Sequence, residues 1–270
     1  NHALYDVVRG SSKLIRPNQT NAEETNAAVS AFTSDGVTLT GGDCFTNASG
    51  YTYASWNWKA GTGQGSSNTD GSINTTYTSV NTTAGFSIYS TTGQWYTYHA
   101  SLGNTHYLDL VSTAAAGDDV EMWNDTSPTS SVFTVGVNGN TNGNGKTTIA
   151  YCFAEKKGFS KFGRFTANGS TNNAFVYTGF KPSWVMMKCD SVTEGWSNWY
   201  MFDTTRNPTN MNTKELMANK NNVESDNGVD YAQIDMLSNG FKIRNGSAWG
   251  PMASGRTNIY VAFAENPFVA

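Results

Sequence analysis

Histidines close to a carboxylate are the first residues of this chain whose types could bind a metal ion or transfer a proton. His99 and His106, with Asp109, form the clearest such group. On a strand, however, positions 99 and 106 point to opposite faces, because side chains alternate along the backbone. We therefore favour separate structural roles over a shared metal or proton-transfer site.

Acidic residues are densest at Asp118, Asp119 and Glu121, whose carboxylates could bind Ca²⁺. They lack the regularly spaced oxygen ligands of a calcium loop, so a solvated loop is the favoured interpretation. The Gly- and Asn-rich run 139–145 lacks the Gly-Lys-Ser/Thr ending of a phosphate loop and is typical of a long hairpin turn. The sequence thus predicts no catalytic residues, no metal site and no cofactor.

The tryptophans divide into two groups by their neighbours. Trp123, Trp196 and Trp249 lie among Asn, Ser, Gly and Asp, where an exposed indole could stack on a sugar ring. They are the candidates for carbohydrate contact, although a structural use is favoured for them as well. The tryptophans predicted to lie in the core are those in strand-like runs: Trp56, Trp58, Trp95, Trp184 and Trp199.

The cysteines carry little functional signal. Cys44, Cys152 and Cys189 cannot all pair within one chain, and none belongs to a close Cys-x-x-Cys pair. Neither a disulfide framework nor a zinc site is indicated. Cys152 lies in a run where a later repeat has Ala262, which predicts a small buried apolar side chain.

Composition excludes several classes of partner. Charged residues make up 14% of the chain and aromatic residues 13%, which favours a folded protein with a polar, weakly charged surface. The net charge of −4 supplies no basic stripe for phosphates, so nucleic acid is not an expected partner. No apolar run approaches the roughly 20 residues of a membrane span, and membrane insertion is not expected.

One pattern occurs three times, in residues 5–58, 98–153 and 202–263. Each copy opens on an aromatic-polar pair, Tyr5-Asp6, Tyr98-His99 or Phe202-Asp203, and closes on an aromatic strand-like run. Repeats of this length exceed the about 20 to 50 residues of solenoid units, so we expect serial modules with separate apolar cores. The repeat position that changes from Asp to His is typical of a turn or strand-end polar group rather than a shared catalytic residue.

Short β-branched and aromatic runs bounded by Gly, Asn and Asp indicate an all-β sandwich or barrel. The predicted strands are 37–39, 51–58, 86–89, 95–99, 132–135, 148–153, 175–177, 184–188, 199–202, 241–243 and 259–263. Ser34-Asp35-Gly36 and Ser238-Asn239-Gly240 each place a residue that tolerates a positive φ, then Gly, before a strand, which predicts tight turns. Residues 20–29 and 213–220 lack an apolar stripe, so we expect at most one or two helical turns there.

Composition shifts suggest module boundaries. Residues 61–83 are Gly, Ser, Thr and Asn with little to bury, which is typical of a linker, and a second seam falls near 156–158. We expect residues 1–60 to be the C-terminal part of a first β-module, 61–157 to be the linker and a second module, and 158–270 to be a third, complete module. The chain opens directly on the repeat, so we also expect it to be an internal piece of a longer protein.

The second module is shorter than the third. The third has two strand-like runs, 175–177 and 184–188, between Gly169 and Trp199, whereas a single residue separates Gly93 from Trp95. A module that lost central strands would leave its apolar neighbours open to water. We therefore expect a segment to be missing from the sequence near Gly93-Gln94.

Several runs together resemble a known group of proteins. They are residues 2–10, 53–61, 98–103, 123–128, 150–155 and 175–182. These runs resemble the tandem modules of large tail-fibre-like virion proteins of marine bacteriophages, which often lie beside lectin-like domains. The resemblance covers nearly the whole chain. It implies an all-β fold of tandem antiparallel β-sandwich modules, jelly-roll or lectin-like, on the surface of an extracellular phage particle, and it brings no catalytic residues.

The resemblance and the repeat predict a non-enzymatic virion structural protein, a tail fibre or host-attachment appendage. A capsid decoration or head-fibre protein, or a carbohydrate-binding adhesin, is the alternative. An enzyme that degrades polysaccharide would need paired carboxylates in a groove, and the carboxylates here are mostly in predicted loops and not shared between copies. The expected partners are other virion proteins, further copies of the chain as in fibres, which are often trimers, and a host surface glycan.

Overall fold

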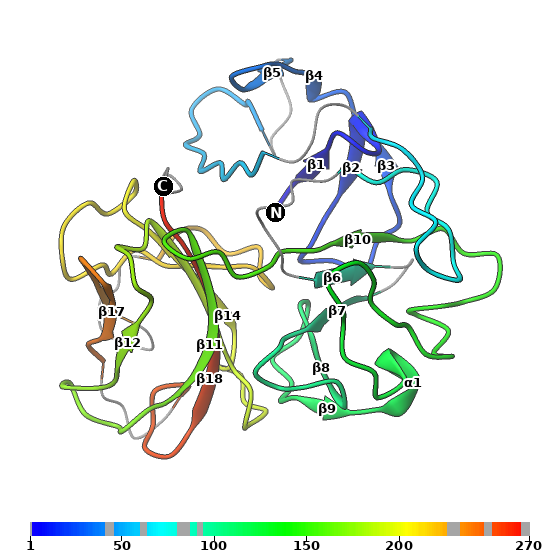
Figure 1. Cartoon of the computed structure of the whole chain (residues 1–270). Coiled ribbons are helices and arrows are strands. Elements are labelled where there is room, and N and C mark those ends of the chain that lie inside the picture. The colour runs from blue at the N-terminus through cyan, green and yellow to red at the C-terminus, as the bar shows by residue number, and fades with distance from the viewer. Residues whose placement is uncertain are drawn as a thin grey trace.

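The chain folds almost entirely into β-strands that pair in antiparallel sheets. A computed structural model describes residues 2–40, 46–59, 64–79, 87–90, 94–225, 233–245 and 250–265. Three lobes surround a common centre (Figure 1). The predicted all-β, sandwich-type fold is confirmed.

The first lobe, at the top of Figure 1, contains a small sheet and a hairpin. Its strands are β1 (Leu4–Asp6), β2 (Gly10–Ile15) and β3 (Glu24–Thr25), in the order β1-β2-β3, and the paired strands β4 (Val29–Phe32) and β5 (Val37–Leu39). The predicted turn at Ser34-Asp35-Gly36 joins β4 to β5, and the Thr33 N–H donates to the Gly36 carbonyl at 2.8 Å. β2 ends on the buried side chains of Leu14 and Ile15.

The second lobe contains one five-stranded sheet and the single helix of the described chain. The elements are β6 (Ser87–Ser90), β7 (Trp95–Tyr98), β8 (His106–Asp109), β9 (Gly117–Asp118), α1 (Val120–Trp123) and β10 (Ile149–Tyr151), and the sheet order is β10-β6-β7-β8-β9. The Asp119 side chain accepts a hydrogen bond from the Glu121 N–H and begins α1, and Asn124, with a left-handed φ of 51°, ends it. The acidic segment predicted to be a solvated loop therefore contains a strand end and a helical turn.

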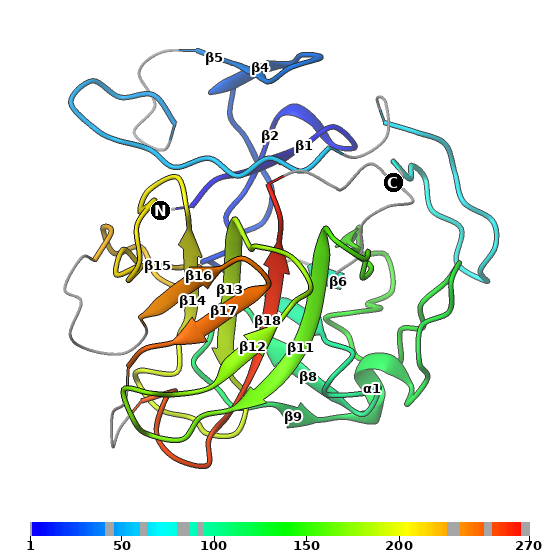
Figure 2. The ribbon, with the colours of Figure 1, turned by 60° about the vertical axis from the view of Figure 1, so that its left-hand side comes forward.

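The third lobe is a β-sandwich of two sheets. Its strands are β11 (Ser160–Thr166), β12 (Phe175–Tyr177), β13 (Trp184–Cys189), β14 (Trp199–Asp203), β15 (Leu216–Met217), β16 (Ile234–Leu237), β17 (Gly240–Ile243) and β18 (Thr257–Phe263). One sheet has the order β11-β18-β13-β14-β15 and the other β12-β17-β16. Figure 2 shows the smaller sheet lying across the larger one.

The larger sheet of the third lobe is buried on both faces. On β13, Val185 and Met187 point into the core between the two sheets, whereas Trp184 and Met186 point the other way into a second core. The same alternation occurs along β14 and β18, whose side chains are apolar at nearly every position. A strand that is apolar at both parities is typical of a sheet covered on both sides.

The second core is shared between all three lobes. It combines Ile15 of the first lobe, Trp95 and Leu108 of the second, and Trp199 and Phe263 of the third. The expectation of modules with separate cores is therefore wrong for this cluster, although the third lobe also has a core of its own between its two sheets. The lobes are joined by buried apolar surface, which stabilises their arrangement by roughly 25 cal/mol per Å².

Several local predictions differ from the structure. Residues 51–58 and 132–135 form no strand, and the side chains of Tyr51, Tyr53 and Phe133 are exposed. Their β-branched and aromatic content reflects fit to a pleated surface, and in the described part of the chain neither run pairs with a strand. The segments 20–29 and 213–220 contain β3 and β15 instead of helical turns.

Part of the predicted linker is held by backbone hydrogen bonds within the segment itself. Residues 64–79 fold back so that Ser66 and Thr78 form a β-bridge, and the Thr78 N–H donates to the Ser66 carbonyl at 2.7 Å. The segment expected to be missing near Gly93-Gln94 adjoins residues 91–93, which lie outside the described residues. The boundaries at 60/61 and 157/158 stay predictions.

Candidate functional site

A largely buried ion pair lies at the end of β1 in the first lobe. Arg9 Nε donates to Asp6 Oδ2 at 2.5 Å, and the Arg9 N–H donates to Asp6 Oδ1 at 2.9 Å. Glu23 lies 3.3 Å from Arg9 Nη1 and 3.2 Å from Lys13 Nζ. We call the group Asp6, Arg9 and Glu23 the first Asp–Arg unit.

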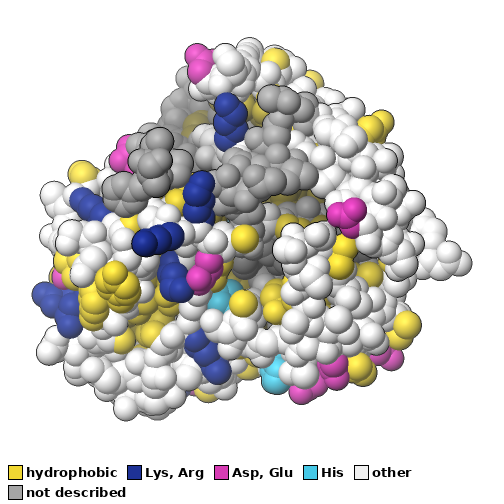
Figure 3. Space-filling view, viewed as in Figure 1, with side chains coloured by type: hydrophobic (Ala, Val, Ile, Leu, Met, Phe, Trp, Pro, Cys, Tyr) yellow, Lys and Arg dark blue, Asp and Glu magenta, His cyan; other side chains and the backbone are white. Residues whose placement is uncertain are grey.

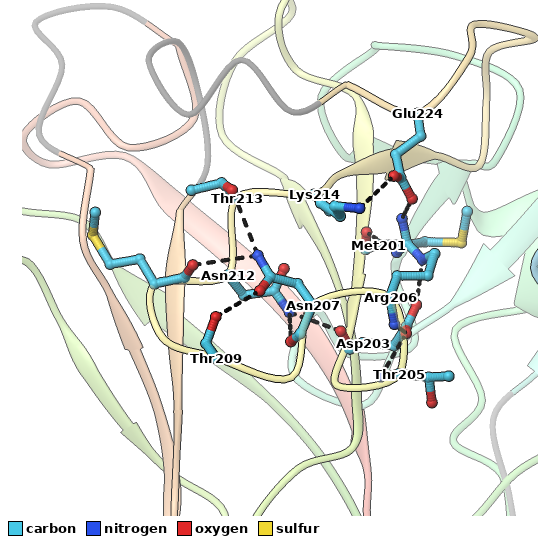
Figure 4. A network of polar contacts seen from close by, with 11 residues as sticks. Met201, Asp203, Thr205, Arg206, Asn207, Thr209, Asn212, Thr213, Lys214 and Glu224 are labelled. Carbon is cyan, nitrogen blue, oxygen red and sulfur yellow. Dashed lines mark hydrogen bonds and ion pairs between the residues drawn. The ribbon is translucent and has the colours of Figure 1, made fainter.

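The third lobe repeats this geometry at the end of β14 (Figure 4). Arg206 Nε donates to Asp203 Oδ2 at 2.5 Å, and the Arg206 N–H donates to Asp203 Oδ1 at 2.8 Å. Glu224 lies 2.9 Å from Arg206 Nη1 and 3.4 Å from Lys214 Nζ. Asp203, Arg206 and Glu224 are the second Asp–Arg unit, and both units hold the turn that follows their strand.

An aromatic side chain from another lobe closes each unit. The Tyr151 hydroxyl of the second lobe donates to Asp6 Oδ2 at 2.5 Å, and burial, with Asp6 nearby, raises the pKa of this phenol. In the second unit, Trp56 Nε1 of the first lobe donates to Asp203 Oδ2 at 3.3 Å, and the Arg206 guanidinium lies 5.5 Å from the Trp56 ring centroid. Because two lobes contribute to each unit, the units fasten the lobes to one another.

The second lobe keeps the backbone of the unit but not its charges. Strand pairing is in the same register in all three lobes, with Leu14 opposite Glu24, Tyr107 opposite Gly117, and Glu215 opposite Ser225. In this register the positions of Asp6, Arg9 and Glu23 fall on His99, Leu102 and Ala116 of the second lobe.

Burial lowers the pKa of His99, which favours the neutral ring at this position. Its Nε2 lies 3.2 Å from the Tyr260 carbonyl of the third lobe. All three charged members of the unit are thus replaced together by groups without a fixed charge, as expected for side chains that act as one unit.

Three aromatic rings at equivalent repeat positions meet at the centre of the molecule. Trp58, Phe153 and Phe263 have ring centroids 5.9, 5.6 and 5.7 Å apart, all in edge-to-face geometry. Edge-to-face pairs at this distance contribute about 0.5–1.5 kcal/mol each beyond area burial. We call these rings the central triad. Since each lobe contributes one ring at an equivalent repeat position, the triad marks an approximate threefold axis within the single chain. Figure 1 shows the three lobes placed around a common centre.

A further contact between lobes also repeats around this axis. Trp199 Nε1 of the third lobe donates to the Asp109 carbonyl of the second at 3.0 Å. At the equivalent position of the first lobe, His2 Nε2 lies 2.9 Å from the Met217 carbonyl of the third lobe. The equivalence follows from strand pairing, since Tyr96 lies opposite Asp109 and Tyr200 lies opposite Met217.

A buried lysine joins the second and third lobes. Lys188 is fully buried, and its Nζ donates to the carbonyls of Thr113 (3.3 Å), Ala114 (2.9 Å) and Cys189 (2.7 Å). Burial lowers the pKa of Lys188 to about 8. These contacts satisfy all three donors of the ammonium group, so they describe a structural anchor rather than a reactive amine.

The outer face of the β12-β17-β16 sheet presents two exposed rings. Phe175 and Tyr177 are 47% and 64% exposed, while Val176 between them packs into the core of the third lobe. Figure 3 shows hydrophobic side chains gathered over β12 and β17, at the left of the molecule. The alternation of an exposed ring, a buried valine and an exposed ring could have been read from the sequence, because a half-buried strand has this period.

Comparison with known families gives two matches to one family, described as a domain of unknown function (DUF7483), over residues 1–94 and 89–267. The chain belongs to this family. No curated protein and no solved structure matches it. The first DUF7483 match contains the first Asp–Arg unit. The second match contains the second unit together with the second lobe, which lacks the charges of the unit.

The tryptophans proposed for sugar contact in this DUF7483 chain differ in their exposure to solvent. Trp123 is 2% exposed, and its Nε1 donates to the His106 carbonyl at 3.0 Å, so this candidate for sugar contact is buried and has the structural use that was favoured for it. Helix α1 turns that ring inward against Tyr98. Trp196 is 49% exposed, and Trp249 lies outside the described residues.

The tryptophans predicted to lie in the core also differ among themselves. Trp95, Trp184 and Trp199 are buried, and Trp56 is partly buried. Trp58 is 39% exposed even though its ring packs in the central triad, so the expectation of a buried side chain is wrong for it. Cys152 is likewise exposed instead of buried, because β10 ends at Tyr151, whereas Cys189 is buried.

The polar candidates of the DUF7483 chain lie apart. His99 is buried near Tyr260, whereas His106 is part-exposed and lies 4.0 Å from Asp118. Asp6 and Asp203 lie at strand ends, as predicted for this repeat position. Within the described residues, no group of three or more His, Cys, Asp or Glu side chains is placed to hold a metal ion. No helix in that part of the chain has the length and apolar character of a membrane span.

Proposed function

We propose that this chain is a non-enzymatic structural protein of a bacteriophage virion, an appendage of the tail-fibre or host-attachment kind. The resemblance of its motifs to marine phage tail-fibre-like modules supports this assignment, as does the repeated all-β architecture. Such a protein would lie on the surface of the extracellular particle, in contact with other virion proteins.

The proposal rests chiefly on one observation: the residues that are equivalent between repeats join the lobes to one another. The equivalent charges pair with one another in the Asp–Arg units, and the equivalent aromatic rings pack in the central triad. A repeat whose common residues join lobes suits a rigid scaffold. Recognition is then left to residues that differ between lobes, such as Phe175 and Tyr177.

The internal threefold arrangement bears on self-association. Fibre proteins are commonly homotrimers, and association with further copies of this chain is part of the proposal. Here three similar lobes already surround one axis within a single chain (Figure 1). A single copy therefore presents the kind of threefold scaffold for which other fibres use three chains.

A capsid decoration or head-fibre protein is the alternative within the structural class, because the same lobes would serve both positions. The deciding experiment labels intact particles with gold-coupled antibodies against the purified chain, followed by electron microscopy. We expect label on a tail or baseplate appendage. Label over the head would favour the decoration alternative, and particles without label would refute a virion role.

The non-enzymatic part of the proposal has its own test. The purified chain is incubated with host surface polysaccharide, and the chain lengths are measured by size-exclusion chromatography. We expect the distribution to stay unchanged. Shortened polysaccharide would show that the chain is a depolymerase and would refute this part.

A further inference from the structure

The two exposed aromatic rings on β12 each lie next to a glycine. The Phe175 Cε2 atom is 3.2 Å from the place where a Cβ of Gly240 would lie, and atoms of the Tyr177 ring are 3.6–3.8 Å from the corresponding place at Gly179. Any side chain at Gly240 would also collide with the Val176 carbonyl, 2.1 Å away. The two rings therefore sit directly over backbone and stay open to a ligand from outside.

The spacing of the two rings suits a chain-like ligand. Positions 175 and 177 share one face of a strand, so their Cα atoms are about 7 Å apart. Each ring can then pack against a separate unit of the ligand. Flat rings of this kind offer an apolar surface to the CH groups of sugar rings while leaving the sugar hydroxyls free.

Polar groups border the rings on the same side of the sheet. Lys242 is the cross-strand partner of Phe175, and its Nζ donates to the Asn173 carbonyl at 3.2 Å. The carboxylate of Asp235, opposite Lys242, is engaged by Arg244 at 3.1 Å. These three charges sum to one positive charge next to Phe175.

Uncharged polar groups lie at the other end of the rings. Tyr177 is the cross-strand partner of Gly240, and the turn before Gly240 exposes the side chains of Ser238 and Asn239. A hydroxyl and an amide beside an aromatic ring are donors and acceptors suited to sugar hydroxyls. The face thus combines stacking rings, hydrogen-bonding groups and one net positive charge.

The size of the apolar surface argues for a small ligand rather than a protein. About half of two aromatic side chains, at about 150–250 Å² each, gives roughly 200 Å². A stable protein interface needs about 800 Å² on each partner. The patch is too small for a protein partner to bind through it alone, and it is large enough for two sugar rings.

We propose that the outer face of the β12-β17-β16 sheet binds an acidic oligosaccharide, with Phe175 and Tyr177 stacking on sugar rings and Lys242 facing an anionic substituent. This inference rests on the proposed function, since it names the ligand class that a host-attachment appendage would recognise. It places the sugar contact on Phe175 and Tyr177, which are exposed, and not on the candidate Trp123, which is buried.

The test titrates the full chain with oligomers of glucuronic acid, and with oligomers of glucose of equal length, using isothermal titration calorimetry and saturation-transfer NMR. We expect the acidic oligomer to bind and the double variant Phe175→Ala/Tyr177→Ala to bind it about tenfold or more weakly. Lys242→Gln should reduce binding of the acidic oligomer to the level of the neutral one. Tyr77→Ala, which removes an exposed ring elsewhere in the chain, should bind as the wild type does.

Three results would overturn the proposal: no binding of the acidic oligomer, equal binding of both oligomers, or undiminished binding by the double variant. Circular dichroism and thermal melting of each variant show whether the fold is kept, which is expected because both rings are exposed. Gold labelling of particles tests the proposed function independently. Labelled appendages together with absent sugar binding would refute only the present inference.

Discussion

At the scale of single residues, Asp203 is the side chain on which the second Asp–Arg unit converges. Its carboxylate accepts hydrogen bonds from the N–H groups of Thr205 and Arg206, from the Arg206 side chain and from Trp56. Asp203→Ala would leave the Arg206 guanidinium, which is largely buried, without this partner. We expect a loss of about 3–5 kcal/mol in the free energy of unfolding, measured by urea denaturation.

Asp70 offers a matched control for this change. It is an exposed aspartate of the segment 64–79, and Asp70→Ala should change the free energy of unfolding by less than about 0.5 kcal/mol.

The second lobe suggests a partial rescue, because it has His99 and Leu102 at the unit's positions. Asp203→His/Arg206→Leu should therefore cost less than the two single changes added together. A strictly additive double variant would contradict the view that these residues act as one unit.

The buried Lys188 predicts a dependence of stability on pH. Its pKa is about 8 in the folded protein against an ordinary value of 10.5. Below pH 8 both states are protonated, and the folded state bears the full cost of a buried charge. Between pH 8 and 10.5 the unfolded state binds more protons, so the free energy of unfolding should rise with pH, by about 3 kcal/mol from this group alone.

Comparison with Lys188→Met isolates this contribution, because the tyrosines titrate in both proteins. Urea denaturation of each protein at pH values from 7 to 10.5 gives the two pH profiles. The wild type should gain stability relative to the variant as the pH rises through this window. Parallel profiles would show that Lys188 keeps an ordinary pKa in the folded protein.

At the scale of elements, the hairpin β16–β17 shows why a correct turn prediction can rest on the wrong reason. Ser238-Asn239-Gly240 forms the expected turn, with Leu237 opposite Gly240, yet neither Asn239 nor Gly240 has a positive φ. Glycine is required instead because a Cβ at Gly240 would lie 2.1 Å from the Val176 carbonyl of β12. That carbonyl belongs to a strand distant in sequence, so local turn rules do not contain it.

Gly240→Ala tests the close approach of β12 and β17. The added Cβ would meet backbone, which has little room to shift, and we expect a loss of about 1–3 kcal/mol in the free energy of unfolding. Gly195→Ala is the matched control, since no heavy atom outside its chain neighbours lies within 4 Å of its added Cβ and its φ is not positive. Thermal melting of both variants measures the difference. Equal melting temperatures of the two variants would show that β12 and β17 can move apart without loss of stability.

Strands were predicted correctly where a run is apolar at both odd and even positions. Prediction failed for strands that are defined mainly by hydrogen bonding to a neighbouring strand. β13, β14 and β18 were predicted because they are apolar throughout and lie in the middle of a sheet. β3 and β9 were missed because they contain no large apolar residue and are defined by pairing with a neighbour. β16 was also missed, although it is apolar at three of its four positions. The run 51–58 shows the reverse case, with strand-like residues but no strand.

In the candidate site, too, local features were predicted correctly and contacts between distant residues were not. The repeat positions of Asp6 and Asp203 were correctly assigned to strand ends, because a local pattern marks them. Their closure by Trp56 and Tyr151 depends on contacts between lobes, which the sequence of one lobe does not encode. Trp123 was misplaced for a related reason: the four-residue helix α1 turns a polar-flanked ring into the core.

At the scale of the whole molecule, the shared core and the central triad make the three lobes interdependent. A chain of separate modules would unfold in several steps, whereas lobes joined by buried contacts should unfold together. We expect one calorimetric transition for the wild type, with equal calorimetric and van't Hoff enthalpies. Resolved transitions for single lobes would contradict a shared core.

The central triad itself can be tested by a double-mutant cycle between lobes. Phe153 of the second lobe and Phe263 of the third have ring centroids 5.7 Å apart at 62° between planes. Phe153→Ala and Phe263→Ala, singly and together, should reveal a coupling of about 0.5–1.5 kcal/mol in the free energy of unfolding. Phe133→Ala, an exposed ring outside the triad, should combine additively with Phe263→Ala. If both pairs are additive, the triad does not join the lobes, and the threefold arrangement must be held by the Asp–Arg units and the surrounding core.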